Sequence, residues 1–176
     1  MSRSVLIPAA IAAAVGATAV PSWAHVTLET KEAVVSSTYK AVFRVPHGCG
    51  AAATTAIRVR FPDGTLSPKP MPHAGWTLTI QEGTLAKPIT AGNDTVTKGV
   101  TEIAWTGGKL ADNEYDEFVI QLTTPAEAGT VLFPLVQECE GGKANRWILA
   151  PGVAAQTGPN GEEISAAPSL KLNPKP

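Results

Sequence analysis

The stretch Ala56-Ile57-Arg58-Val59-Arg60-Phe61, followed by Pro62-Asp63-Gly64, carries the clearest structural signal in the chain. Its large apolar residues recur at every second position, which is the period of a half-buried β-strand. Ile57, Val59 and Phe61 therefore share one face of the expected strand, and the two arginines share the other. The proline, aspartate and glycine that follow predict a turn that ends the strand.

The same period of two residues returns on both sides of this stretch, in short segments separated by glycine and proline. Short strands at such spacing predict an all-β sandwich. No window of 12 or more residues carries a helical stripe, and only residues 124–128 are compatible with a single helical turn. The further expected strands are residues 25–29, 38–45, 76–80, 100–105, 117–122, 130–137 and 145–149.

The first 24 residues have the features of a secretory signal peptide. Arg3 gives a positive start, an apolar run follows over residues 5–20, and the small residues Ser22 and Ala24 stand three and one before the expected cut. The apolar run is short for a membrane span, so a retained anchor is the weaker alternative. Cleavage after Ala24 makes His25 the first residue of an exported protein, periplasmic or extracellular, with no membrane span in its mature form.

Removal of 24 residues from 176 leaves 152, a size suited to one domain. We expect residues 25–150 to form this β-sandwich domain. Prolines are frequent after Ala150, among Gly, Ala, Ser and Lys, so residues 151–176 are expected to form a Pro-rich tail. The mature chain has 13 basic and 15 acidic side chains, and no run of like charge. This balance argues against a nucleic-acid partner.

Cys49 and Cys139 are the two cysteines of the chain. In an exported protein a single pair is most simply a disulfide, and this one closes a loop of about 90 residues. Closure of a loop that long stabilises a fold by roughly 4–5 kcal/mol in the chain-entropy model. The alternative is a thiolate metal site, since copper(I) prefers sulfur ligands.

An amino-terminal His25 offers a metal two nitrogen donors, its α-amine and its imidazole Nδ1. Copper(II) favours nitrogen ligands in a planar arrangement, so the expected cleavage predicts a copper(II) site. The alternating segment His25-Val26-Thr27-Leu28-Glu29 predicts a strand that ties this terminus to a sheet.

Several blocks of the mature chain resemble the YcnI-like exported copper-binding proteins. They are Ala24-His25-Val26-Thr27-Leu28-Glu29, Phe43-Arg44-Val45-Pro46-His47-Gly48-Cys49, Trp76 after Gly75, Ala104-Trp105-Thr106-Gly107-Gly108, and Gln137 to Trp147 through Cys139. The resemblance implies an antiparallel β-sandwich of fibronectin III-like or cupredoxin-like layout. It also implies copper(II) held by the amino-terminal histidine, with a carboxylate from a neighbouring strand and a tryptophan close by.

The chain departs from the best-known form of this family at Ser36-Ser37, where that form carries a Trp-Glu pair. The carboxylate ligand therefore does not carry over, and His47 is the leading substitute because neutral imidazole is a good copper ligand. Trp147 is the candidate for the tryptophan beside the metal, although it and Trp105 are equally suited to a sandwich core. The candidate acidic ligands are Glu29, Glu138 and Glu140.

The expected function is copper(II) binding in trafficking or homeostasis, with transfer to a partner protein and no catalysis. Two other classes stay open: a β-sandwich adhesion or interaction module without metal, and a copper-dependent oxidative enzyme. Hydrolytic motifs such as GxSxG and HExxH are absent from the sequence. His73, in a proline-rich loop, is expected to be exposed and not to bind metal.

Overall fold

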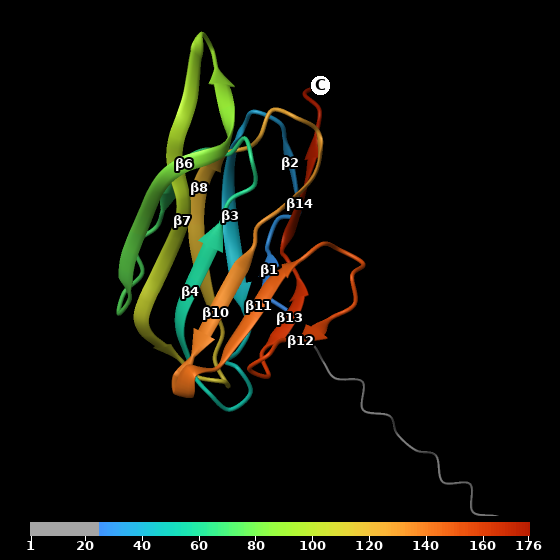
Figure 1. The fold of residues 1–176 in the computed structure, drawn as a ribbon. Coiled ribbons are helices and arrows are strands. Elements are labelled where there is room, and N and C mark those ends of the chain that lie inside the picture. The colour runs from blue at the N-terminus through green and yellow to red at the C-terminus, as the bar shows by residue number, and fades with distance from the viewer. Residues whose placement is uncertain (1–24) are drawn as a thin grey trace, which may run out of the picture.

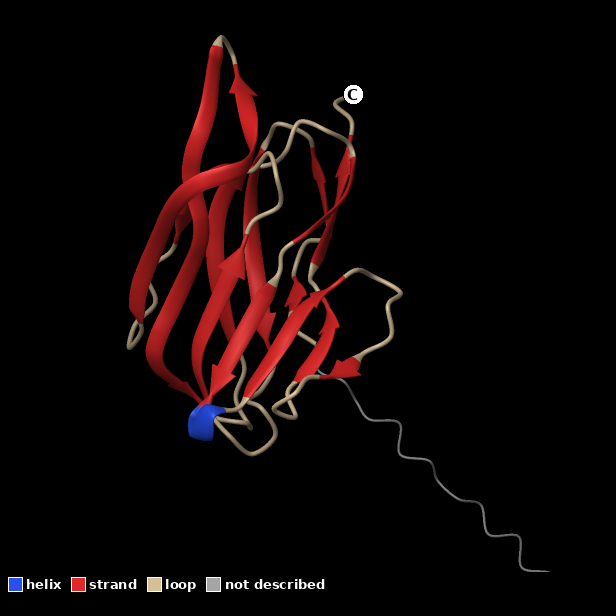
Figure 2. Ribbon diagram, viewed as in Figure 1, coloured by secondary structure: helices blue, strands red, loops and turns tan. Residues whose placement is uncertain are grey.

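A computed structural model describes residues 25–176 of the chain, and residues 1–24, with the predicted cleavage after Ala24, lie outside it. The described part is built almost entirely of strands joined by turns (Figure 2). The strands are β1 (Thr27–Leu28), β2 (Glu32–Val34), β3 (Thr38–Val45), β4 (Thr54–Arg60), β5 (Leu66–Pro70), β6 (Thr77–Ala91), β7 (Asp94–Leu110), β8 (Asp116–Thr123), β9 (Gly129–Leu132), β10 (Leu135–Cys139), β11 (Ala144–Leu149), β12 (Gln156–Thr157), β13 (Glu163–Ala166) and β14 (Ser169–Asn173).

Three sheets form the sandwich (Figure 1). One has the strand order β1-β3-β8-β5, and a larger one has the order β12-β13-β11-β10-β4-β7-β6. A small sheet of β2, β14 and β9 completes the fold. Pairing is antiparallel except between β11 and β13 and between β14 and β2. The predicted antiparallel sandwich is therefore confirmed in its architecture.

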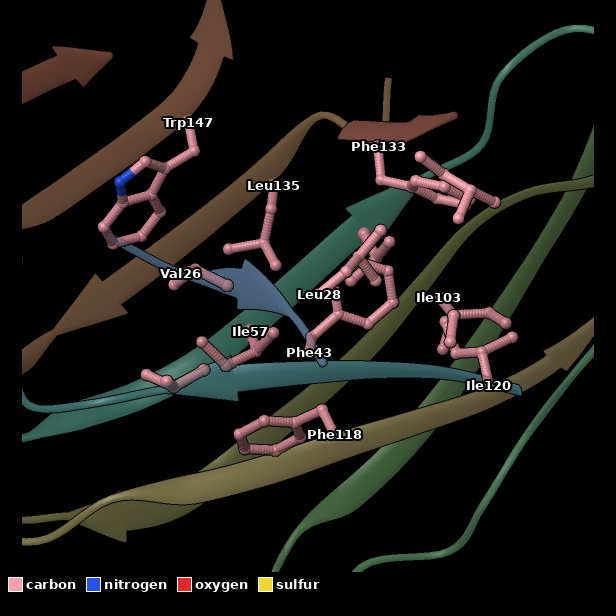
Figure 3. Close-up of a cluster of buried hydrophobic side chains, with 14 of the residues drawn as sticks. Val26, Leu28, Phe43, Ile57, Ile103, Phe118, Ile120, Phe133, Leu135 and Trp147 are labelled. Carbon is pink, nitrogen blue, oxygen red and sulfur yellow. The ribbon is translucent and has the colours of Figure 1, made fainter. Parts of the chain in front are cut away.

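The core lies between the two larger sheets, where the inward positions of each strand meet (Figure 3). Phe43 on β3 and Ile57 and Val59 on β4 are fully buried, as their alternation predicts. Phe118 on β8 packs its ring 5.3 Å from that of Trp105 on β7. The strands predicted over residues 38–45 and 56–61 are confirmed, with boundaries within two residues.

Two of the predicted segments differ from what the structure shows. Residues 130–137 form two strands, β9 and β10, which pair in different sheets. Phe133 and Pro134 separate them; Pro134 lacks an N–H for a sheet ladder, and Phe133 turns into the core. Residues 124–128 form no helical turn, and the single short 3₁₀ segment of the described residues is Glu140–Gly142.

The strands predicted over residues 76–80 and 100–105 are parts of a longer hairpin. β6 and β7 pair from Thr77↔Thr106 to Ala91↔Asp94, and their far halves extend beyond the body of the sandwich (Figure 1). Gly92, at φ 64, occupies the left-handed region at the hairpin tip, which favours glycine there.

The prediction of a Pro-rich tail over residues 151–176 is corrected by the structure. β13 pairs with β11, and β14 pairs with both β2 and β9. Leu170 and Leu172 alternate with Lys171 and are buried in the same core as β3 and β4. The prolines at positions 168 and 174 stand outside β14, where they do not interrupt its ladder. The sandwich domain therefore extends past residue 150 to residue 173.

None of the helical segments in residues 25–176 is long and apolar enough to span a bilayer.

Candidate metal centre

The pairing of β1 with β3 fixes the position of His25. Thr27 lies opposite Arg44 and Leu28 opposite Phe43. Continuation of this antiparallel register by two residues places His25 opposite Pro46, next to His47. His25 is half-buried, and β1 is the edge strand of its sheet. The two candidate histidines therefore lie at the same end of the sandwich.

The backbone around His47 is held by a buried glutamine. Gln137 on β10 donates from Nε2 to the carbonyl oxygen of His47 at 2.7 Å, and the same nitrogen lies 2.6 Å from Thr54 Oγ1. Asn145 on β11 donates to Gln137 Oε1 at 3.4 Å. Gln137 is 1% exposed, so these bonds satisfy an amide that burial would otherwise make costly. The sequence marked Gln137 as a family residue but gave it no role.

The disulfide fixes the segment that follows His47. Cys49 and Cys139 are bonded, with Cα atoms 6.0 Å apart, and this joins the loop after β3 to the end of β10. The predicted pairing is confirmed. Residues 25–176 hold no free cysteine, so the thiolate alternative has no ligand in this form of the protein.

The carboxylate nearest to His47 is one that the sequence did not single out. Asp112, in the loop between β7 and β8, has Oδ1 3.7 Å from His47 Nδ1. The same ring nitrogen contacts the carbonyl oxygen of Gly48. Asp112 and His47 are 65 positions apart, and no periodic pattern marks the loop, so only the fold brings them together.

The three predicted acids are engaged elsewhere. Glu29 accepts a hydrogen bond from Arg44 at 2.7 Å on the outer face of the four-stranded sheet. Glu138 lies 2.7 Å from Arg58 on the larger sheet, and this hydrogen bond raises the pKa of Arg58. Glu140 pairs with Lys109 at 3.0 Å. These partners leave Asp112 as the better carboxylate candidate beside His47.

Trp147 lies inside the sandwich at the same end as His25. The side chain is 2% exposed, and its ring reaches from β11 toward the start of β1, beside Val26 (Figure 3). Its indole Nε1 has no hydrogen-bond partner among residues 25–176, and neither has the hydroxyl of Ser165, its pairing partner on β13. An unsatisfied buried donor costs about 1–3 kcal/mol. Trp147 is thus a core residue whose indole N–H has no hydrogen-bond partner in the described residues.

The Ser36-Ser37 departure falls at the other end of β3. Ser37 donates from Oγ to the carbonyl of Val34, and its N–H donates to Thr124 Oγ1 at 3.0 Å. Eight residues of β3 separate this turn from His47, a distance of about 25 Å at the usual strand rise. A carboxylate at this turn would be too far away to complete a site at His25, so the departure leaves the donors at that end unchanged.

His73 is less exposed than predicted. Its Nε2 lies 2.8 Å from Asp116 Oδ2, and its ring centroid lies 5.0 Å from that of Phe118 and 6.1 Å from that of Trp76. Trp105 is fully buried and donates from Nε1 to the carbonyl of Met71 at 3.1 Å. Both residues have structural partners that account for their positions.

The described residues offer few side chains that are grouped as metal ligands. No group of three or more His, Cys, Asp or Glu side chains in residues 25–176 is placed to hold a metal ion. An amino-terminal histidine differs from such a cluster because its amine and imidazole supply two donors from one residue. As the expected first residue of the mature protein, His25 offers two nitrogen donors, the type of ligand that copper(II) favours.

The comparison with one solved structure agrees with the fold. A protein from Nocardia farcinica, described as uncharacterized and with an immunoglobulin-like fold in its crystal structure, is 25% identical, with a TM-score of 0.60 over 84% of this chain and 97% of that one. A cohesin module of a family 33 glycoside hydrolase from Clostridium perfringens is 10% identical, with a TM-score of 0.45 over 85% of this chain and 96% of that one. A search of curated proteins found no match.

The family of this chain is shown by a match to a family model over almost all of the described residues. The model for a domain of unknown function, DUF1775, matches residues 25–172, from the candidate terminal histidine into the last strand of the sandwich. The match includes β13 and β14, in agreement with their place in the core. The chain therefore belongs to the DUF1775 family, the family of the YcnI-like proteins.

Proposed function

We propose that the mature protein begins at His25 and binds one copper(II) ion there, as a carrier that exchanges copper with a partner protein outside the cytoplasm. Copper is the cargo of this protein, and its binding requires no chemical step. The observation that supports the proposal is the β1–β3 register, which, continued from Thr27↔Arg44, brings His25 and His47 to the same end of the sandwich. The resemblance to the YcnI-like proteins points to the same residue.

The surroundings of His25 suit an exchangeable metal. β1 pairs with β3 from Thr27 onward, two residues after His25, so the chain that follows His25 is held at the edge of the sheet. The disulfide and Gln137 hold the loop that carries His47. His47 is 31% exposed and Asp112 is 50% exposed, so a partner protein can approach this end and offer competing ligands.

The experiment is a copper(II) titration against a competing chelator, with protein whose first residue is His25. We expect one tight equivalent. A variant with one alanine added before His25 keeps the imidazole but loses the free amine next to it, and its affinity should collapse. Equal affinity for the two proteins would reject the amino-terminal site.

A second comparison tests the neighbouring donors. His47→Ala should weaken copper(II) binding at least tenfold, which corresponds to about 1.4 kcal/mol. His73→Gln is the matched control, because His73 is the other internal histidine and pairs with Asp116 instead. If both variants bind like the native protein, His47 is not a ligand, and the site consists of His25 and other donors.

A further inference from the structure

A cavity beside the disulfide gives small molecules access to one of its two cysteines. The cavity has a volume of about 350 Å³ and lies between the start of β11 and the loop that leads into β13 (Figure 1). Among the described residues that line it, Cys49 is the one cysteine. Cys49 is 7% exposed and Cys139 is 5% exposed, so both are otherwise covered by the fold. A small molecule in the cavity therefore meets Cys49 and not Cys139.

The wall of this cavity carries an excess of positive charge. Lys143 and Arg146 both line it, and Glu162 is the one acidic residue among the described residues that do. Glu162 Oε1 lies 3.6 Å from Arg146 Nε, so this carboxylate offsets a single cation. Lys143 has no acidic partner within residues 25–176. A small anion, such as a thiolate, is therefore attracted to the side of the disulfide that Cys49 presents.

The other sulfur of the disulfide has a hydrogen-bond donor beside it. Thr54 Oγ1 lies 3.9 Å from Cys139 Sγ and accepts a hydrogen bond from Gln137 Nε2 at 2.6 Å. Because the amide nitrogen only donates, the hydroxyl hydrogen of Thr54 is left for the sulfur. This hydrogen bond stabilises the thiolate that forms when Cys139 leaves the disulfide. Gln137 Nε2 also donates to the carbonyl oxygen of His47, so the same network holds the loop that carries Cys49.

We propose that Cys49–Cys139 is an exchangeable disulfide, opened by a small anionic dithiol from this cavity, and that the two thiols so formed hold one copper(I) ion. One thiolate of the dithiol attacks Cys49 Sγ, the bond between the cysteines breaks, and Cys139 leaves as a thiolate. The second thiolate attacks the mixed disulfide and releases Cys49, so the dithiol is oxidised to its cyclic disulfide and the protein gains two electrons. The two protons that the dithiol lost go to the cysteine thiolates.

The reduced pair has the chemistry and the spacing for copper(I). Copper(I) prefers sulfur ligands, and its binding displaces the two thiol protons. The Cα atoms of the cysteines lie 6.0 Å apart, and the pairing of β10 with β4 holds Cys139 opposite Thr54. In an oxidising compartment the pair stays closed until a reductant arrives. Copper enters this inference as the cargo of the proposed function, so the copper(I) half rests on that proposal.

The first test measures how fast thiols open the disulfide of the native, oxidised protein. The probes are the anion mercaptopropionate and the neutral mercaptoethanol, with rates compared per thiolate. The anionic thiol should react roughly threefold faster or more, and mass spectrometry of the acid-trapped adduct should place it on Cys49. Lys143→Gln should remove this preference, whereas Lys109→Gln, which removes a cation paired with Glu140, should keep it. An adduct on Cys139, or equal rates for the two thiols, would overturn the exchange step.

The second test titrates reduced protein, freed of reductant, with copper(I) under argon against a coloured copper(I) chelator. We expect one equivalent, bound at least tenfold more tightly than by the double variant Cys49→Ser/Cys139→Ser. Circular dichroism accompanies the titration, because loss of the disulfide lowers stability, and a chain that unfolds on reduction should regain its native spectrum with copper(I). Equal affinity of the two proteins, or a reduced chain that copper(I) does not refold, would reject the copper(I) site.

A variant with one alanine before His25 separates this site from the proposed function. It disrupts the proposed copper(II) site but keeps both cysteines, so after reduction it should bind copper(I) as the native protein does. Unchanged copper(II) affinity in this variant rejects the amino-terminal site of the proposed function. Loss of its copper(I) affinity rejects instead the assignment of copper(I) to the two cysteines.

Discussion

At the residue scale, one of the two closest packing contacts of a glycine involves Trp76. The ring of Trp76 lies flat against Gly108 on β7, where a Cβ atom would stand only 2.1 Å from the indole Cε2. We predict that Gly108→Ala lowers the free energy of unfolding by about 1–3 kcal/mol, because the ring must move or the strand must shift. Urea unfolding followed by fluorescence measures this change.

A glycine on the same strand provides the control for that substitution. A Cβ on Gly99 would meet Leu85 at 3.4 Å, an ordinary van der Waals distance. Gly99→Ala should therefore change stability much less than Gly108→Ala. Equal effects of the two substitutions would show that backbone propensity, and not contact with Trp76, determines the cost.

Tyr39 gives a prediction about alkaline pH. Its hydroxyl donates to the Thr30 carbonyl at 2.5 Å, and burial, with the nearby charge of Glu29, raises its pKa to about 12. Below about pH 10 the phenol is neutral in both folded and unfolded chains, so it does not make stability depend on pH. Between about pH 10 and 12 the unfolded chain loses this proton first, and stability must fall.

Absorbance at 295 nm measures the ionisation of Tyr39 directly. The chain has two tyrosines, so in a Tyr115→Phe background the signal reports Tyr39 alone. The midpoint should lie near 12, and Tyr39→Phe should flatten the fall of stability above pH 10. A midpoint near 10 would show that the phenol is solvated in the folded protein.

At the element scale, alternation of apolar residues predicted the strands that form the centre of both large sheets. β3, β4 and β8 each bury large apolar residues at alternate positions, although some residues between these positions are buried as well. The pattern failed for short strands and for strands with proline. β5 contains Pro68 and Pro70, yet it pairs because it is an edge strand that bonds only to β8.

β14 is the element for which the sequence prediction was most clearly wrong. Proline content dominated the reading of residues 151–176, while the alternation in Ser169-Leu170-Lys171-Leu172 was the informative signal. A strand of five residues gains its stability from long-range partners, here β2 and β9. Composition of the local chain could not reveal those partners.

This correction leads to a truncation test. Removal of residues 169–176 deletes Leu170 and Leu172 from the core and should leave the protein largely unfolded or aggregated. Removal of residues 174–176, after β14 ends, should leave the unfolding midpoint unchanged within error. Circular dichroism during thermal unfolding distinguishes the two. Equal stability of both truncated proteins would show that β14 does not contribute to the stability of the core.

At the scale of the whole molecule, the candidate site could be only partly predicted. The expected signal peptide and the motif predicted His25 and His47, and the expected compartment predicted the disulfide, which the structure contains. Asp112 was not predicted, because it lies far along the chain from His47 and becomes its neighbour only through the fold. The excluded acids Glu29 and Glu138 looked suitable until cross-strand arginines accounted for them.

The disulfide should carry a large share of the stability of the fold. It joins residues 90 positions apart, so its removal should cost roughly 4–5 kcal/mol through the greater freedom of the unfolded chain. The double variant Cys49→Ala/Cys139→Ala should unfold at a much lower urea concentration than the oxidised native protein. A shift of less than about 1 kcal/mol would mean that the reduced unfolded chain is already constrained.

The central claim is that copper(II) binds the free amine and the imidazole of a terminal His25. The most direct measurement is the EPR spectrum of protein that begins at His25, loaded with one equivalent of copper(II) and compared with the same protein after selective acetylation of its α-amine. The native spectrum should show nitrogen couplings from both groups, and acetylation should abolish that species. An unchanged spectrum after acetylation would contradict the claim.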